Sequence, residues 1–385
     1  MNSPKIRFKG YTEDWEQRKL DDVTVKIGSG KTPSGGENAY VDAGIPLIRS
    51  QNVNDNKVDF EDIVYIDEST DKLMMNSRVF ANDVLLNITG ASIGRSAVYK
   101  GLDEANVNQH VCIIRPIEGY HPDFIQLNLA SDRGQKQIKS SQAGGGREGL
   151  NFQQIGKMEF VFPTLDEQKQ IGNYFNNIDH LITLHQRKCE QTKTLKKYML
   201  QKMFPQEGQK VPEIRFEGFT GDWEQRKLGE LGTVQTCKRI FKEQTSEKGD
   251  IPFFKNGTIG LEPDSYISRE MYEEFRRLYP YPEVGDTLIS VVGSIGRTAE
   301  YTGKDEYFQD SNVVWLKTDG SINKKFLKIS YQVIKWLIEG STVKHLYNDN
   351  ILRSEIVMPV SQIEQAKIAE FFEELDHLIT LHQCK

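Results

Sequence analysis

The sequence predicts a mixed α/β (α+β) fold with two tandem globular domains that form an internal repeat. Three observations carry this prediction. Both ends of the first half recur in the second half, each interior alternates short β-rich runs with turns, and a long helical pattern follows the first interior. The length of 385 residues agrees with two or three domains of roughly 150 residues each and excludes a single small module.

The repeat is most evident at its two ends. Residues 6–20, IRFKGYTEDWEQRKL, return as residues 214–228, IRFEGFTGDWEQRKL, at an offset of 208. Residues 179–186, DHLITLHQ, return unchanged as residues 376–383, at an offset of 197. The second interior is therefore 208 − 197 = 11 residues shorter, a difference that loops normally absorb.

The interiors are more divergent but remain related. IPLIR at 45–49 corresponds to IPFFK at 251–255, and SIGR at 92–95 recurs at 294–297. Apolar runs predict strands over residues 83–88 and 286–291, and helical spacing predicts helices over residues 122–137 and 324–339. We therefore expect the two interiors to share one mixed fold.

A long helix is predicted from about residue 165 to residue 204, because its apolar residues step by three or four. At 1.5 Å per residue it would reach roughly 60 Å and act as a spacer. The second copy starts near residue 362, and Lys385 corresponds to Lys188, so we expect a shorter second helix. The seam of the first helix comprises Ile171, Phe175, Ile178, Ile182, His185, Cys189, Thr192, Leu195 and Met199.

Composition narrows the function classes. The mean hydropathy of −0.55, with no long apolar run and no charged-then-apolar leader, predicts a cytoplasmic protein without a membrane span. The four cysteines form no Cys-x-x-Cys pair, so neither a zinc site nor a disulfide framework is indicated. The net charge is −6, and any DNA-binding surface must therefore be locally basic or shared with a partner.

Several motifs occur in the same order in both halves, and together they identify a resemblance. In the first half they are Arg7-Phe-x-Gly10, DWEQRKL at 14–20, TGASIGR at 89–95, Phe162-Pro163 leading to Glu167-Gln168-x-x-Ile171, and Ile178-Asp179-x-Leu181-Ile182. With these motifs the chain resembles the specificity (S) subunit of type I restriction-modification systems, over essentially its whole length.

The resemblance implies two target recognition domains, each reading one half of an interrupted, asymmetric DNA site, and two long helices that form an antiparallel coiled coil. Residues 1–165 would be the first target recognition domain, 166–210 the central conserved helix and spacer, 211–361 the second target recognition domain, and 362–385 a shortened C-terminal conserved helix. Half-sites read from one face of a duplex lie about one helical turn apart, roughly 34 Å, which a helical spacer can set.

The resemblance also implies a non-catalytic subunit. Its expected partners are double-stranded DNA, two adenine-N6 methyltransferase subunits and, through them, two restriction (endonuclease and translocase) subunits. S-adenosylmethionine, ATP and Mg²⁺ would be bound by those partner subunits, and this chain would carry no cofactor.

The duplication separates two kinds of candidate DNA contact. Residues that both interiors share, Arg95 and Arg297, are predicted phosphate contacts, although their turn could equally serve only to connect two strands. Divergent residues with paired donors or acceptors are predicted base readers. The candidates are Lys31, Arg49, Gln51, Asn52, Gln109, His110 and Arg147 in the first interior, and Lys238, Arg239, Lys255, Asn256, Gln309, Asp310, Lys344 and His345 in the second.

Two rival functions are a stand-alone nuclease and a structural or anti-restriction decoy that binds methyltransferase subunits without reading sequence. Glu167-Gln168-Lys169 matches part of many nuclease sites, but it opens a predicted helix, where acidic residues favour the positive helix end. No Asn/Asp-Pro-Pro-Tyr/Phe tetrapeptide occurs, so a methylating site must lie on another chain. The repeated ends could dock two identical partners or pack against each other, and both roles remain open.

Overall fold

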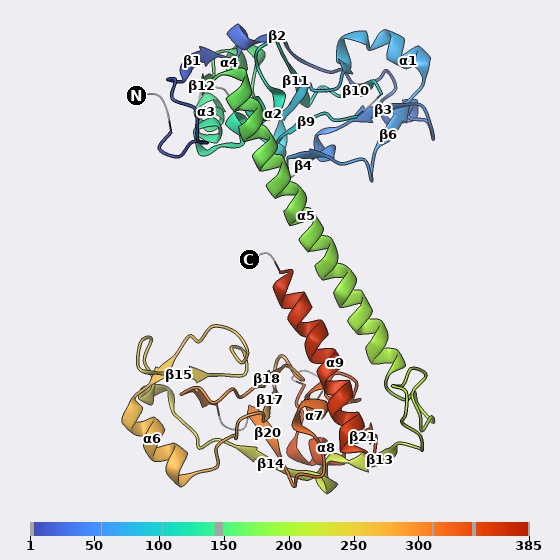
Figure 1. Cartoon of the computed structure of the whole chain (residues 1–385), viewed down its shortest axis with the longest axis vertical. Helices are drawn as coiled ribbons and strands as arrows, with labels where there is room; N and C mark the ends of the chain where they lie inside the picture. Colours follow the sequence, from blue (N-terminus) through green and yellow to red (C-terminus); the bar gives the residue numbers. More distant parts are fainter. Residues whose placement is uncertain are drawn as a thin grey trace. The chain divides into compact units, whose positions relative to one another are not determined.

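The computed structural model consists of two compact units, Met1–Leu181 and Ile182–Lys385. It describes residues 4–54, 56–101, 103–142, 149–309, 312–340 and 344–383. Each unit combines helices with sheets, as the sequence predicts (Figure 1).

Two four-stranded sheets form most of the first unit. One is antiparallel, in the order β2 (Thr24–Ser29), β11 (Val111–Pro116), β8 (Val84–Asn87) and β9 (Ser96–Val98). The other has the order β6 (Val64–Ile66), β3 (Ile45–Ile48), β10 (Ala105–Val107) and β7 (Arg78–Val79), and its β3–β10 pair is parallel. Strand β8 is apolar at consecutive positions because Val84 and Leu86 pack into one core cluster while Leu85 packs into another.

Smaller elements complete this unit. The strands β1 (Glu16–Lys19) and β12 (Glu159–Phe162) pair antiparallel, as do β4 (Val53–Asn54) and β5 (Lys57–Val58). The predicted helix over residues 122–137 is split into two helices at Ser131, which caps the first of them. The unit's short helices are α1 (Glu68–Leu73), α2 (Pro122–Ala130), α3 (Asp132–Gln142) and α4 (Phe152–Gly156).

The second unit repeats this topology. Its antiparallel sheet has the order β14 (Gly232–Thr236), β20 (Val313–Thr318), β17 (Thr287–Ser290) and β18 (Thr298–Glu300). Its second sheet has the order β16 (Tyr266–Ile267), β15 (Ile251–Phe254) and β19 (Tyr307–Phe308), with β15 and β19 parallel. The pair of β13 (Glu224–Lys227) with β21 (Glu355–Met358) matches β1 with β12. The short helices are α6 (Arg269–Leu278), α7 (Lys324–Ser330) and α8 (Asn348–Arg353).

The helix predicted over residues 324–339 is too long. Helix α7 ends at Ser330, and Glu339 instead pairs with His345 in an antiparallel bridge. The side chain of Trp336 lies against the ring of Tyr331, with ring centroids 5.5 Å apart. These tertiary contacts, together with β-branched residues at 333 and 334, outweigh the helical spacing of the segment.

The two long helices are α5 (Leu165–Lys202), predicted over residues 165–204, and α9 (Gln362–Leu381). Within the second unit they run antiparallel, because residues later in α5 meet residues earlier in α9 (Figure 1). Leu195, predicted in the seam, is exposed, and Lys196 takes its place against α9. The contacts in order are His185 with His382, Cys189 with Ile379, Lys196 with Asp376, and Phe204 with Phe372.

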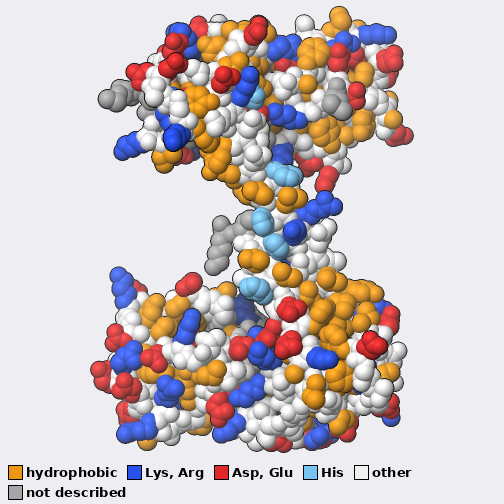
Figure 2. Space-filling view, viewed as in Figure 1, with side chains coloured by type: hydrophobic (Ala, Val, Ile, Leu, Met, Phe, Trp, Pro, Cys, Tyr) orange, Lys and Arg blue, Asp and Glu red, His pale blue; other side chains and the backbone are white. Residues whose placement is uncertain are grey.

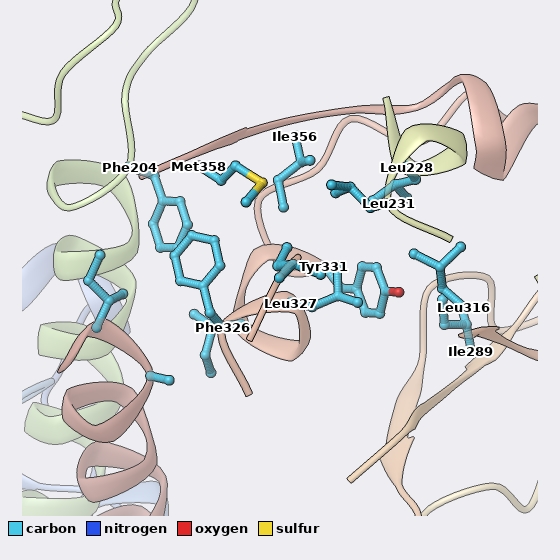
Figure 3. Close-up of a cluster of buried hydrophobic side chains, with 14 of the residues drawn as sticks. Phe204, Leu228, Leu231, Ile289, Leu316, Phe326, Leu327, Tyr331, Ile356 and Met358 are labelled. Atoms are coloured by element: carbon cyan, nitrogen blue, oxygen red, sulfur yellow. The ribbon is translucent and has the colours of Figure 1, made fainter. Parts of the chain in front are cut away.

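The core of the second unit begins where α5 ends. Phe204 stacks on Phe326 of α7, with centroids 5.8 Å apart, and meets the ring of Trp223 edge-on. Figure 3 shows this cluster continuing to Met358 of β21 and Ile289 of β17. The end of the long helix is thus part of the hydrophobic core and is held rigidly by it.

Among the described residues, no helix is both long and apolar enough to cross a membrane.

The repeat supplies a matched stability test. Phe372 on α9 is 0% exposed, whereas its repeat counterpart on α5, Phe175, is 45% exposed. We expect Phe372→Ala to destabilise the second unit by about 3 to 5 kcal/mol, because it leaves a cavity, and Phe175→Ala to cost less than about 1 kcal/mol. Urea unfolding followed by tryptophan fluorescence measures both losses, since Trp223, Trp315 and Trp336 lie in the second unit with Phe372, and Trp15 lies in the first unit with Phe175. Equal losses for both variants would contradict the packing described here.

Candidate nucleic-acid interface

In each unit a buried ion pair ties the start of the unit to its helix. Arg7 Nε and Nη2 donate to the two carboxylate oxygens of Glu167 at 2.9 and 2.7 Å. Arg215 donates to Glu364 in the same way, at 2.7 and 2.9 Å. This hydrogen bond raises the pKa of the Arg215 guanidinium above its ordinary value. The carboxylate that resembled part of a nuclease site therefore closes the fold.

The neighbouring glutamine has an equally specific structural role. Gln168 Oε1 accepts from the backbone N–H of His121 at 2.9 Å, and Gln365 Oε1 accepts from that of Asn323 at 2.8 Å. The Glu-Gln pair thus fastens the start of each long helix to the globular part of its unit. The sequence left two roles open for the repeated ends. The ion pairs of Arg7 with Glu167 and of Arg215 with Glu364 show one of them, the packing of the ends against each other.

Several loops of the first unit converge at the end of β8. The N–H of Ile88 donates to the carbonyl of His110 at 3.0 Å, and the N–H of Leu150 donates to the carbonyl of Ile88 at 2.9 Å. The Ser-Ile-Gly-Arg turn folds back on the same strand, because the N–H of Asn87 donates to the carbonyl of Arg95 at 2.8 Å. Three segments distant in sequence are therefore held at one place.

The second unit reproduces this arrangement bond for bond. Val291 donates to Asn312 at 3.0 Å, Leu346 donates to Val291 at 3.0 Å, and Ser290 donates to Arg297 at 2.9 Å, all between backbone groups. The side chains carried by these loops differ between the units. A common backbone frame with variable side chains is an arrangement suited to reading different sequences on ligands of one geometry.

We use the name interface loops for the loops at these two places together with the loops that carry the predicted DNA contacts. The name covers residues 30–32, 49–52, 88–95 and 108–110 of the first unit, and residues 238–239, 255–258, 291–297 and 344–346 together with Gln309 of the second.

Two predicted base readers of the first unit are held by a carboxylate. Arg49 Nη2 donates to the carbonyl and the carboxylate of Asp62 at 2.7 and 3.3 Å, and Gln51 Nε2 donates to the same carboxylate at 2.5 Å. Asn52 is only 2% exposed, and its amide nitrogen donates to the backbone of the loop. Because the amide is committed to the loop, the prediction that Asn52 reads a base does not fit this geometry.

The other candidates of the first unit lie at the exposed side of the loops. Gln109 is exposed and accepts a hydrogen bond from Thr32, next to the exposed Lys31. His110 Nδ1 lies 2.5 Å from the hydroxyl of Thr89, in the loop that also carries the exposed Arg95. Arg147 lies outside the described residues, as does Asp310 of the second unit.

In the second unit, basic side chains lie over aromatic rings or pair with an acid. Lys238 Nζ is 4.9 Å from the ring centroid of Tyr279, and the guanidinium of Arg239 is 6.0 Å from that of Phe241. Lys255 Nζ is 2.9 Å from a carboxylate oxygen of Asp264, and this bond lowers the pKa of Asp264.

Some of the remaining candidate side chains of this unit donate hydrogen bonds to carbonyls of the interface loops. Asn256 donates through its side chain to the carbonyl of Val292 at 3.0 Å, and its backbone N–H donates to Gln309 Oε1 at 3.2 Å. The ring of His345 stacks on Tyr347 at 4.3 Å. Arg297 Nη1 donates to the carbonyl of Gly257 at 3.0 Å, and Lys344 is exposed.

Residue type alone does not single out the two carboxylates, Asp62 and Asp264, because base reading is expected mainly of cationic and amide side chains. Asp62 lies three residues before Tyr65 and Asp264 two residues before Tyr266, although the two tyrosines occupy matching strand positions. Because one acid lies three residues and the other two residues before its tyrosine, a sequence alignment of the two halves does not pair them. The three-dimensional structure shows that each acid pairs with the cation that follows the matching strand.

Charge is mixed over the face of each unit that Figure 2 draws. On the face drawn in Figure 2, Lys and Arg side chains intermingle with Asp and Glu side chains. Among the described residues, no group of three or more His, Cys, Asp and Glu side chains is placed to hold a metal ion.

Comparison with known proteins identifies relatives of both halves. The model of the type I restriction modification DNA specificity domain matches residues 12–194 and 220–385. A putative type I restriction enzyme specificity subunit of Haemophilus influenzae is 46% identical over 158 residues, which are 40% of this chain and 41% of that protein. A putative type I restriction enzyme specificity subunit of Methanocaldococcus jannaschii is 25% identical over 99% of this chain and 91% of its own length.

A solved structure supports the fold. The type I restriction-modification S subunit from M. genitalium superposes with a TM-score of 0.64 at 14% identity, over 99% of this chain and 94% of that chain. These findings confirm the resemblance identified from the sequence motifs.

The buried ion pair gives a prediction for the second unit. Glu364→Gln leaves the largely buried guanidinium of Arg215 without its counter-charge, and we expect a loss of about 2 to 3 kcal/mol in the free energy of unfolding. The exposed Glu374→Gln on the same helix is the matched control and should change stability by less than about 0.5 kcal/mol. Thermal unfolding compares them, and equal melting temperatures would refute the structural role of the pair.

Proposed function

Because the chain belongs to the family of type I restriction-modification DNA specificity proteins, we propose that it is the non-catalytic subunit that determines the DNA sequence recognised by such a complex. The observation that carries the proposal is the backbone frame of the interface loops, repeated bond for bond in two units whose side chains differ. Each unit would read one half of a bipartite, interrupted site on double-stranded DNA.

The long helices supply the second part of the proposal. His185 and His382 are repeat counterparts, 382 − 185 = 197 positions apart, and their Nδ1 atoms lie 2.8 Å apart. A residue that meets its own counterpart marks a local pseudo-twofold axis, and such an axis favours the binding of two identical partners. We propose that these partners are two methyltransferase subunits, that the helices set the spacing of the half-sites, and that two restriction subunits join through the methyltransferases.

Chemistry would then be carried by the partner subunits. S-adenosylmethionine would bind to the methyltransferase subunits, ATP and Mg²⁺ to the restriction subunits, and no cofactor to this chain. The contribution of this chain is to position the adenine of each half-site for its partner by holding the DNA in register.

The test is methylation mapping. The chain is co-expressed with a type I methyltransferase subunit in a methylation-free host, and modified adenines are sequenced across the genome. We expect one bipartite, interrupted motif, and replacement of residues 21–160 by the same region of another specificity subunit should change only one half of it. A stable complex that methylates no motif would indicate the decoy function, and DNA cleavage by the pure chain with Mg²⁺ and ATP would indicate the nuclease.

The shared arginine gives a second prediction. Arg95 is exposed in the interface loops, and as a phosphate contact it should add affinity without sequence preference. We expect Arg95→Ala to weaken binding to cognate and unrelated duplexes alike, to reduce the slope of log affinity against log salt by about 0.9, and to leave the methylated motif unchanged. Arg18→Ala, which removes the same charge from β1, is the control. A changed motif would instead make Arg95 a base reader.

A further inference from the structure

Each unit carries an ion pair at the same place among its interface loops. Arg49 directly follows β3 and Lys255 directly follows β15, the matching strand. Asp62 lies just before β6, the strand that pairs with β3, and Asp264 lies just before β16, the strand that pairs with β15. The loop between cation and acid differs in length and sequence, yet both units close it with the same kind of pair.

We infer that Asp62 and Asp264 are specificity-determining residues, which restrain the cations of the interface loops and repel the phosphate backbone of non-cognate DNA. This inference rests on the function proposed above. It assigns a role to two acidic residues in a surface where anionic side chains would otherwise only weaken DNA binding.

The geometry of the first unit places the acid outside the cation. The Arg49 side chain is 18% exposed, whereas that of Asp62 is 78% exposed. An approaching phosphate would therefore meet the carboxylate before the guanidinium. The same carboxylate also holds the amide of Gln51, so one acid orients two candidate base readers.

In the second unit, too, the acid of the ion pair is more exposed than the cation, although the residues and the loop length differ. Lys255 is 37% exposed and Asp264 57% exposed, and the acid sits one alignment position away from Asp62. A lysine replaces the arginine, and the loop between the partners is four residues shorter, 13 − 9 = 4. Retention of the charge pair despite these changes indicates that the pairing itself, and not one particular loop structure, is what both units require.

The physical consequence concerns non-specific affinity. Sequence-independent binding grows with the number of phosphates that free cations neutralise. A cation held by a carboxylate contributes little to that term, since a phosphate must compete with the bound acid and is repelled by it. Base acceptors in the groove are neutral and oriented, so they can take over the donors of Arg49 or Lys255 without that repulsion. The pair therefore lowers binding everywhere except where the base edges fit.

The experiment uses the full chain co-expressed with a type I methyltransferase subunit, and compares Asp62→Asn with Glu61→Gln. Both variants remove one negative charge from adjacent exposed positions, but only Asp62 contacts Arg49. We expect Asp62→Asn alone to bind a labelled non-cognate duplex about threefold to tenfold more tightly, with a salt slope steeper by about 0.9. The methylated motif should become degenerate in the first half-site only, and Asp62→Glu should restore it.

Asp264→Asn, with Glu262→Gln as its control, should relax the second half-site only. Equal effects of Asp62→Asn and Glu61→Gln would show that only net charge matters and would overturn the inference. If the Asp→Asn variants had a lower melting temperature and bound every duplex more weakly, the ion pairs would only stabilise the loops, and this result would also overturn the inference. If the unaltered complex neither binds DNA nor methylates a motif, the proposed function fails first, and that outcome is distinct from both of the others.

Discussion

The rest of the structure depends on the buried guanidinium–carboxylate pair that joins the first segment of each unit to the start of its long helix. Arg7 with Glu167, and Arg215 with Glu364, bring the two ends of each interior together. The adjacent two-stranded pairings, β1 with β12 and β13 with β21, close the same junction. The interior of each unit therefore starts and ends at the same junction. Its loops can differ between the units without disturbing the long helix, because both ends of the interior are fastened to the start of that helix.

This constraint explains which parts of the chain are duplicated nearly unchanged. A buried ion pair tolerates the loss of one partner poorly, because the remaining charge is left desolvated. The strands and helix starts around it are equally restricted, since Gln168 and Gln365 bond to backbone groups that must stay in register. By contrast, the common frame at the ends of β8 and β17 is held by backbone hydrogen bonds, which any side chain except proline permits. Strong similarity at the ends and divergence within the interiors therefore follow from where side-chain chemistry is required for folding.

The fold was largely predictable for the same reason. The repeat located both units, and apolar spacing located α5 and α9, because a seam of three-and-four spacing has few alternative structures. Prediction failed where a single tertiary contact decides the outcome. The segment after Ser330 has helical spacing, but Trp336 packs on Tyr331 and the chain continues through a turn into an irregular segment. Leu195 was expected in the seam, yet the pairing of Lys196 with Asp376 places the charged residue there instead.

The interface was predictable only as a region. Residue type suggested Arg49, Gln51 and Asn52 as neighbours with similar roles, but the structure gives each a different environment. Asn52 is buried and shapes the loop, Arg49 lies beneath a carboxylate, and Gln51 shares that carboxylate from the exposed side. Asp62, whose backbone or side chain accepts hydrogen bonds from all three, lies ten or more positions away, and its residue type gave no reason to select it. A recognition surface consists of the hydrogen-bond donors that remain available after the loops have satisfied their own hydrogen bonds. Which donors remain available depends on the folded chain and not on its composition.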